Sequence, residues 1–546
     1  MAEEKKAVST ASGTESPTPE VVTEKYTMKQ HWKCLAACTL MSLCPFQYGI
    51  DFGLIGGMQA MVGFLRVFGY EDPNVPGGWN LSAERQQLIS SLMTLGAFLS
   101  SSMAGPIAGV MSRRMTIWAA SLLCIVANVI MMATTNIAGL YAGRLLLGLA
   151  NGMFMTFSQL YIQECSPARY RGLMISSFQV WTSIGSLVGT VVDNFTAKID
   201  GRNAYLIPLG LIYIIPVILS LALLFVPESP RWLAQHGKFE QARKALRWHR
   251  PGPDSEIDEE LSEIQAGLEK ERANEQGVAV WDMFRNPVDR RRTVLATCAL
   301  TVQGASGAMY MIAYGTYFFQ MAGIGSAFEN SCILNAVGVV AILINCGLIT
   351  HFGRRRVFLV SGLILCGIAQ LLTAVIYTVH PGTQSTGQAI VGLSVVYILG
   401  YNLWDLTLTV AQGMVATYAW ISGGELPSQR LRSYTFGFAT AVGFFTAWLT
   451  TFTAPYFINP DSLNWGPKYG FIWTPSCFIS ALWVFFFLPE VKDRTLEEID
   501  EMFEARLPAR KFRKYVSIGR AGGPATGSGS DEKEVEAIHA EEVTKA

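Results

Sequence analysis

Apolar residues gather into long runs along this chain, and short polar segments separate the runs. A helix of about 20 residues crosses the roughly 30 Å hydrocarbon core of a bilayer, and only helices and closed barrels can do so. Twelve runs reach that length and are far too long for barrel strands. They span residues 33–57, 86–109, 115–135, 138–163, 173–193, 205–226, 292–321, 329–350, 356–378, 390–422, 434–455 and 468–488. The pattern therefore predicts an all-α membrane protein with twelve transmembrane helices.

The same charged residues return in the second half of the chain, at the same kind of apolar boundary. A membrane unit that is present twice is typical of transporters, because two halves can rock about a site held between them. We therefore expect two pseudo-symmetric six-helix bundles. The repeated features are Glu164 and Arg171 with Glu425 and Arg432, Pro227-Glu228 with Pro489-Glu490, and Arg113-Arg114 with Arg354-Arg355.

Lysine and arginine lie mainly in one alternate set of loops, which the positive-inside rule assigns to the cytoplasm. Both termini and the long middle loop are therefore expected to be cytoplasmic. The middle loop has charged helical periodicity at Phe239–Leu246 and Ile257–Leu268, which predicts short amphipathic helices that join the halves. The expected organisation is a disordered tail at 1–27, a first bundle at 28–228, a helical linker at 229–290, a second bundle at 291–490, and a tail at 491–546 that is disordered from about 519.

Composition supports a membrane protein and argues against other classes. Half of the 546 residues are hydrophobic and 15% are charged, against about 25% charged in soluble domains. The 42 basic and 42 acidic residues balance, so no overall field favours nucleic acid. The ten cysteines lie almost wholly in apolar runs without metal spacing, and no phosphate loop or nucleophile arrangement indicates an enzyme or a cofactor. Asn80 and Asn194 begin glycosylation sequons in loops expected outside, although such triplets also arise by chance.

Asp51 is the acidic residue expected deepest in the membrane, since it lies about 27 Å along a helix from Lys33. Arg144, early in the fourth run, is a candidate partner at similar depth. A carboxylate in a bilayer is costly unless it is paired or faces water, so we interpret Asp51 and Arg144 as a proton-coupling pair. A structural ion pair, or a position at the outer interface, is the alternative.

Charges at the expected cytoplasmic ends of the runs indicate a gate. Carboxylate–arginine pairs can hold such a gate closed and then separate when the halves rock. Ordinary positive-inside topology with incidental acids is the alternative, and recurrence in both halves favours the gate. The candidate gate residues are Arg113, Arg114, Glu164, Arg171, Arg354, Arg355, Glu425 and Arg432.

Taken together, several motifs resemble those of the sugar porter family of the major facilitator superfamily, and residues 30–505 are similar to fungal hexose and α-glucoside permeases. The resemblance implies alternating access around a central site, and often proton symport through an acid and an arginine at the positions of Asp51 and Arg144. The motifs are Gly143-Arg144, Tyr161-Ile162-Gln163-Glu164, Pro227 to Leu233, Gly353-Arg354-Arg355, Glu425-Leu426-Pro427, and Pro489-Glu490 with the following Arg494 to Ile499.

The resemblance also implies substrate-binding roles for Gln179, Gln303 and Trp420, and for Tyr314 as a gating aromatic residue. These residue types suit a sugar, because amides bind hydroxyls and an indole stacks on the C–H face of a sugar ring. Interhelical hydrogen bonds are the alternative role for the two glutamines, and core packing for the two aromatic residues.

Three amides that the family places in the second half are absent here, since Gly304, Met309 and Gly443 stand at their positions. Each lost hydrogen bond removes about 1 kcal/mol, so a standard hexose site would lose roughly two orders of magnitude in affinity. The substrate is therefore expected to be larger than a monosaccharide or less polar than a sugar. Gly109 also replaces the family aspartate ahead of Arg113, which removes one anchor of the gate.

We therefore predict a proton-coupled secondary transporter that moves a hexose or, in better agreement with the altered site, a di- or oligosaccharide. It is expected to act as a monomer in the plasma membrane, with the sugar, protons and lipid as partners and without cofactor, metal or nucleic acid. The alternatives are a transporter or exporter of a non-sugar metabolite or organic acid, a passive sugar facilitator, and a sensor that does not transport.

Overall fold

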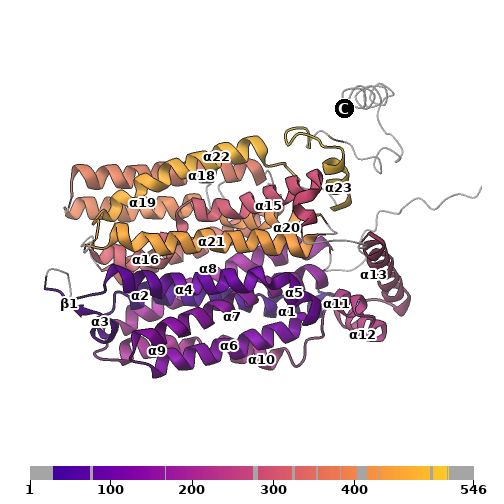
Figure 1. Ribbon diagram of the computed structural model, residues 1–546, viewed down its shortest axis with the longest axis horizontal. Helices are drawn as coiled ribbons and strands as arrows, with labels where there is room; N and C mark the ends of the chain where they lie inside the picture. The colour runs from indigo at the N-terminus through magenta and orange to yellow at the C-terminus, as the bar shows by residue number, and fades with distance from the viewer. Residues whose placement is uncertain are drawn as a thin grey trace, which may run out of the picture.

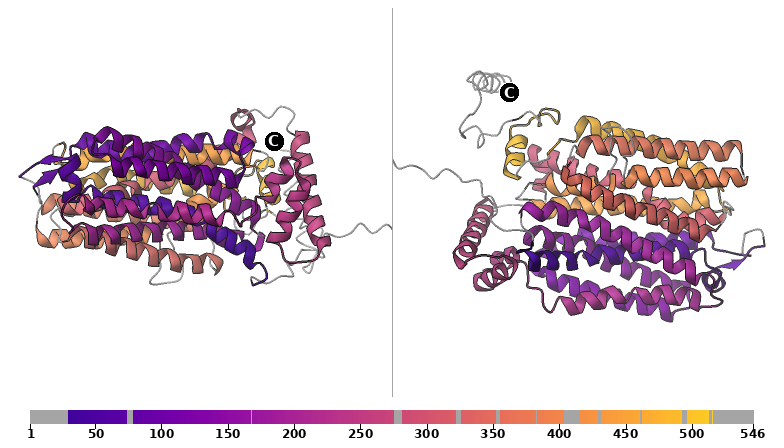
Figure 2. Two further views of the ribbon diagram at one scale, coloured as in Figure 1. Left: turned by 90° about the horizontal axis from the view of Figure 1, so that it is seen from below. Right: turned by 180° about the vertical axis from the view of Figure 1, so that it is seen from behind.

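The structure, a computed structural model, shows two bundles of helices that lie side by side with their axes roughly aligned (Figure 1). It describes residues 29–73, 78–166, 168–274, 281–321, 326–351, 355–381, 383–402, 415–428, 431–460, 462–491, 496–512 and 515. The tails predicted at 1–27 and beyond 519 lie outside these residues. Helices α11 to α13 gather at one end of the bundles, which we name the linker end, and β1 and α3 mark the opposite, distal end (Figures 1 and 2).

The first bundle is formed by the first part of the chain, up to the Pro227-Glu228 motif. A short antiparallel hairpin, in which Tyr70 pairs with Asn80, lies at its distal end. Its elements are α1 (Trp32–Met41), α2 (Leu43–Met58), α3 (Val62–Phe68), β1 (Tyr70–Glu71), β2 (Trp79–Asn80), α4 (Ala83–Ser102), α5 (Ala104–Val110), α6 (Arg113–Ala133), α7 (Ile137–Cys165), α8 (Ala168–Thr196), α9 (Asn203–Leu211) and α10 (Ile214–Ala222).

Short helices follow in the linker, and α12 and α13 coincide with the two charged periodic segments of the sequence. The linker helices are α11 (Pro230–Gln235), α12 (Phe239–His249), α13 (Asp254–Asn274) and α14 (Asp282–Arg285). The second bundle and the segment after it contain α15 (Pro287–Ala305), α16 (Ala308–Met321), α17 (Ala327–His351), α18 (Arg355–Val379), α19 (Gln384–Asn402), α20 (Val415–Glu425), α21 (Arg432–Ile458), the 3-10 helix η1 (Gly466–Tyr469), α22 (Gly470–Phe487) and α23 (Leu496–Glu504).

The helices agree with the twelve predicted runs. Among the described residues, eight helices are long and apolar enough to cross a membrane, or ten when each of two bent pairs counts as one crossing. The remaining two runs fall on α8 and on the pair α19 and α20, between which residues 403–414 lie outside the described part of the chain. The predicted all-α fold with two helical bundles is confirmed.

Glycines bring α2 and α8 into backbone contact. A Cβ atom placed on Gly49 of α2 would lie 2.0 Å from the Thr182 carbonyl oxygen, and one on Gly53 would lie 2.5 Å from the carbonyl oxygen of Ser186. From the other side, a Cβ on Gly185 would lie 2.2 Å from the Phe46 carbonyl oxygen. Small residues spaced four apart let membrane helices approach this closely. The contact fixes α2, which carries Asp51, against α8, which carries Gln179.

Substituting valine for Gly49 is expected to prevent this packing and to leave little monodisperse protein. Overpacking costs about 1–3 kcal/mol when side chains can adjust, and here the obstacle is backbone, which no rotamer change relieves. Size-exclusion chromatography and thermal denaturation in detergent measure the effect. Gly210→Val is the matched control, because a Cβ at Gly210 has nothing within 4 Å. Equal yield and melting temperature for the two variants would contradict the packing described.

Candidate functional site

A cavity of about 140 Å³ lies between the two bundles. The first bundle contributes residues of α2, α7 and α8 to its wall, and the second contributes residues of α15, α16, α17, α19, α20 and α21. Its lining is Tyr48, Gly49, Phe52, Met155, Gln179, Thr182, Ser183, Ser186, Leu300, Gln303, Gly304, Ala308, Met309, Met311, Ile312, Leu334, Asn335, Gly338, Ile398, Tyr401, Trp420, Thr440, Gly443, Phe444 and Ala447. A site shared by two pseudo-symmetric halves is the arrangement that alternating access requires.

Three of the four predicted substrate residues line this cavity. Gln179 faces it from α8, and Gln303 and Trp420 face it from α15 and α20. The indole Nε1 of Trp420 donates a hydrogen bond of 2.9 Å to Oε1 of Gln303, so these two side chains form one unit. The Trp420 ring lies 5.8 Å from that of Phe178, which brings the second bundle against the first.

The cavity wall is mostly apolar and carries no Asp, Glu, Lys or Arg among the described lining residues. Gly304, Met309 and Gly443, the positions without the family amides, all belong to it. Sequence reasoning missed other polar groups in the wall. Asn335 accepts a hydrogen bond of 2.8 Å from Ser186 on the opposite bundle, and Tyr401 contributes a hydroxyl. The apolar runs predict the helices that carry these residues, but they do not predict how each helix is rotated about its axis and hence which side chains face the cavity.

Tyr314 lies nearer the distal end and is not among the described lining residues. Its side chain is buried, and its hydroxyl donates a hydrogen bond of 2.7 Å to the carbonyl oxygen of Thr451. The hydroxyl of Thr451 in turn lies 3.2 Å from that of Thr94 on the first bundle. Tyr314 therefore supports a contact that holds the two bundles together beyond the cavity.

Further contacts close the distal end. The Asn459 side chain donates to the carbonyl oxygen of Leu81 at 3.0 Å and to Oε1 of Gln86 at 3.3 Å, across the two bundles. The Tyr317 hydroxyl donates to Oδ1 of Asn80 at 3.2 Å. Asn80 is 1% exposed, so this conformation does not present the sequon at Asn80 for a glycan. Asn194, the other sequon residue, is partly exposed near the end of α8.

Asp51 is buried on α2, and its hydrogen-bond partner is one that the sequence analysis did not identify. Asn151 of α7 donates to Oδ2 of Asp51 at 2.5 Å, while Oδ1 has no hydrogen bond. Arg144, also buried on α7, donates to the carbonyl oxygen of Ile89 at 3.0 Å and to the Met93 sulfur at 3.2 Å. Both side chains are described, and no ion pair within 4.0 Å joins them. Asp51 and Arg144 therefore do not pair directly in this conformation, and their proton-coupling role stays a prediction.

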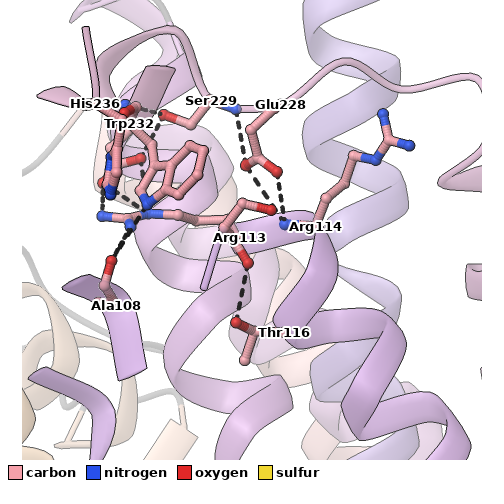
Figure 3. A network of polar contacts seen from close by, with 10 residues as sticks. Ala108, Arg113, Arg114, Thr116, Glu228, Ser229, Trp232 and His236 are labelled. Carbon is pink, nitrogen blue, oxygen red and sulfur yellow. Dashed lines mark hydrogen bonds and ion pairs between the residues drawn. The ribbon is translucent and has the colours of Figure 1, made fainter. Parts of the chain in front are cut away.

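At the linker end, Arg113 and Glu164 form a buried ion pair. Nη2 of Arg113 lies 2.7 Å from Oε1 of Glu164, and the two side chains are 7% and 12% exposed. The Ser229 hydroxyl donates to the other carboxylate oxygen at 2.5 Å, and its oxygen also accepts from the Trp232 backbone amide at the start of α11. The Trp232 indole donates to the Ala108 carbonyl oxygen at 3.3 Å (Figure 3). The pair therefore joins α6 and α7 to the linker, within the first bundle.

The Pro-Glu motifs occupy equivalent positions in the two bundles. Glu228 accepts a hydrogen bond from the Arg114 backbone amide at 3.2 Å, at the start of α6 (Figure 3). Glu490 accepts one from the Arg356 backbone amide at 3.0 Å, at the start of α18. A carboxylate at a helix N-terminus satisfies free amides and is favoured by the helix dipole. The repeat read from the sequence therefore corresponds to a repeated structural contact.

The second half of the predicted gate is described only in part. Arg354 lies outside the described residues, as do the side chains of Arg171, Arg355 and Arg432. Glu425 is the last residue of α20 and is half-buried. Next to it, Arg292 of α15 donates to the Leu426 carbonyl oxygen at 2.8 Å and forms an ion pair with Asp500 of α23. The sequence analysis missed this contact, which docks α23 on the second bundle.

Comparison with known proteins decides the family. The family model described as "Sugar (and other) transporter" matches residues 37–503. This chain belongs to the sugar porter family of the major facilitator superfamily. The transporter is 28% identical to the major facilitator-type transporter ecdD of Aspergillus rugulosus, over 92% of this chain and 93% of that protein. It is 26% identical to the hexose transporter HXT10 of Saccharomyces cerevisiae, over 90% of this chain and 89% of that protein.

Another relative of the transporter is the alpha-glucosides permease MPH3 of Saccharomyces cerevisiae, 27% identical over 88% of this chain and 78% of that protein. The fold also matches the solved structure of the proton:xylose symporter XylE bound to 6-bromo-6-deoxy-D-glucose, with a TM-score of 0.70 and 19% identity over 88% of this chain and 100% of that one. The twelve-helix architecture predicted from the apolar runs is therefore that of the family.

Proposed function

We propose that this sugar porter moves a sugar by alternating access, with a proton entering alongside it. The observation that supports the proposal best is the cavity between the bundles, into which Gln179, Gln303 and Trp420 face. These side chains offer amide groups for hydroxyls and an indole for the C–H face of a ring. The relatives named hexose transporter and alpha-glucosides permease support a sugar as substrate, and the absence of three family amides favours a di- or oligosaccharide over a hexose.

Asp51 is the residue that we propose to carry the coupled proton. It lies between Gly49 and Phe52, both of which line the cavity, so its protonation can respond to the state of the site. With Oδ2 held by Asn151, a proton on the other oxygen would neutralise a carboxylate that the interior stabilises poorly. Binding of proton and sugar would then favour the same closed conformation, which is the condition for coupled transport.

We further propose that the linker end faces the cytoplasm of a cell whose plasma membrane holds the transporter as a functional monomer. The arginine-rich ends of the helices at the linker end support this orientation. Arg113 and Glu164, with Ser229, would then act as a positioning cluster of the cytoplasmic gate.

A second candidate function keeps the same fold and cavity but has a less polar substrate. The mostly apolar wall, to which Met309, Met311 and Phe444 contribute, favours a metabolite with a substantial hydrophobic part. Such a molecule would make use of the space that the missing amides leave.

Uptake into proteoliposomes, with and without an inward proton gradient, tests these proposals. The panel contains labelled glucose, maltose, a trisaccharide and an aryl glycoside. We expect a di- or trisaccharide to accumulate only with the gradient. If the aryl glycoside is the only compound whose uptake depends on the gradient, the second candidate is supported. Uptake that is the same with and without the proton gradient would contradict proton coupling. Protein-free liposomes supply the background for each compound.

A further inference from the structure

A second carboxyl group, that of Asp193, is buried in the first bundle near the distal end of α8. Its side chain is 1% exposed, and neither carboxylate oxygen has a hydrogen-bond partner among the described residues. An ionised carboxylate in such surroundings is strongly disfavoured unless it is paired or hydrated. The closed conformation therefore suits Asp193 only as a neutral carboxylic acid. The sequence analysis missed it, because it stands at the end of an apolar run, where charged residues normally reach water.

A glycine of α2 makes the space that the Asp193 side chain occupies. A Cβ atom on Gly57 would lie 2.0 Å from Oδ2 of Asp193, so any larger residue at 57 would displace the carboxyl group. Gly57 precedes the break between α2 and α3, where the chain direction changes by 79°. On α8, residues 185, 189 and 193 are spaced four apart and so lie on one face of the helix. Gly185 and Gly189 on this face pack against the backbone of α2. The carboxyl group therefore lies in the close contact of two helices, beside a bend.

Asp193 also lies between the cavity and the distal end. It follows Ser186, which lines the cavity, by about 10 Å along the helix. On this side α8 contacts the second bundle, since Ser186 donates to Asn335 and the Cys332 thiol donates to the Thr190 carbonyl oxygen at 3.3 Å. A change in the hydration of Asp193 would therefore act on the contact between the bundles as well as on α2.

No cation compensates Asp193 in the described structure. Lys198, in the turn after α8, is exposed and forms no ion pair with it. Helix α20 contacts α8 farther away, around Phe178. The ionisable residues that the other packed helices contribute on this side are Tyr48 and Asp51 on α2, Tyr141 and Arg144 on α7, Tyr205 on α9, and Glu329 and Cys332 on α17, and none of them hydrogen-bonds to Asp193. A proton is therefore the means by which this carboxyl group becomes neutral.

We propose that Asp193 is a second proton-binding residue of this transporter, which must take up a proton from the solution at the distal end before that end can close. When the distal end is open, water can stabilise the carboxylate. Closure against Gly57 removes the water, so the closed state requires the neutral acid, and low pH on this side favours it. The proposal rests on the proposed alternating access, but not on which solute is carried or on the role of Asp51.

Infrared difference spectroscopy between acidic and alkaline buffer tests the protonation step on purified transporter in lipid nanodiscs, without substrate. We expect C=O stretches of buried carboxylic acids in the parent, to which Asp193 and Asp51 each contribute. Asp193→Asn should remove the Asp193 contribution, which Asp51→Asn should retain. Asp200→Asn, which changes an exposed aspartate after α8, is the matched control. A spectrum that Asp193→Asn leaves unchanged would show that Asp193 does not titrate and would overturn the proposal.

Labelling of Cys332 by a membrane-impermeant maleimide, quantified by mass spectrometry, tests the link to closure. Ionisation of the thiol raises labelling with pH in every variant, whereas opening of the distal end adds to it only where Asp193 is present. We expect the labelling of Cys332 to rise more steeply with pH in the parent than in Asp193→Asn. Asp193→Ser, with a smaller side chain, should behave in the same way and replaces Asp193→Asn if that variant misfolds. Equal profiles would overturn the proposal. Because neither experiment uses a sugar, failure of sugar uptake or of Asp51 coupling would be a separate result.

Discussion

Replacing Asp51 by asparagine is expected to abolish uphill accumulation of the substrate while leaving exchange across the membrane intact. Asparagine keeps the size of the side chain but cannot bind and release a proton, so the coupling free energy disappears. The accumulation ratio in proteoliposomes with an inward proton gradient should then fall to about one, as for a passive carrier. Counterflow of labelled substrate, which needs no gradient, measures the exchange that should remain.

Asn151→Ala is the informative companion to Asp51→Asn. It removes the 2.5 Å hydrogen bond to Oδ2 but keeps the carboxyl group, so we expect accumulation to persist with a changed dependence on external pH. If Asp51→Asn accumulates substrate as well as the parent does, Asp51 is not the coupling residue. Accumulation that is lost equally in both variants would indicate a structural role instead.

Replacing Glu164 by glutamine is expected to cause the largest loss of stability at the linker end. The substitution leaves Arg113, whose side chain is 7% exposed, without its negative partner. Breaking a buried ion pair from one side costs about 3–5 kcal/mol, because the remaining charge stays buried. It also weakens the hydrogen bond from Ser229 that anchors α11. We expect a lower melting temperature in detergent and slower exchange transport.

The ion pair of Arg243 with Asp258 provides a control for this substitution. It joins α12 to α13 with a hydrogen-bond distance of 2.5 Å, but both side chains are substantially exposed. Water and ions screen such pairs, so Asp258→Asn should leave melting temperature and transport close to the parent values. Equal losses from Glu164→Gln and Asp258→Asn would argue against a special role for the buried pair.

Local sequence patterns predicted the elements of this fold and their repetition. Apolar runs of membrane-spanning length follow from the thickness of the bilayer, so each predicts a helix without knowledge of its neighbours. The Pro-Glu motifs were recognised as a repeat, but their structural role was not, because Glu228 and Glu490 accept from backbone amides at the starts of α6 and α18, far away in the sequence. The resemblance to the family added Gln179, Gln303 and Trp420, which do face the cavity; their binding role stays a prediction.

Contacts between helices were less accessible to sequence reasoning, because they depend on how each helix is rotated and where it crosses its neighbour. Asp51 and Arg144 stand at similar depth, yet Asn151 rather than Arg144 reaches the carboxylate. The burial of Asp193 depends on Gly57, a residue on a different helix. Spacing along the sequence gives the height of a residue in the membrane, but not the direction in which its side chain points.

The polarity of α8 has a consequence for the synthesis of this transporter. Its inner part carries the hydroxyl groups of Thr182, Ser183 and Ser186 to the cavity, and Asp193 stands near its end. A segment with such residues partitions poorly into lipid alone, where no other helix covers them. It should therefore enter the bilayer together with a neighbouring helix. Helix α2, whose glycines pack against the backbone of α8, is synthesised earlier and is available for this contact. The polar surface that lines the cavity should thus also affect when α8 enters the membrane.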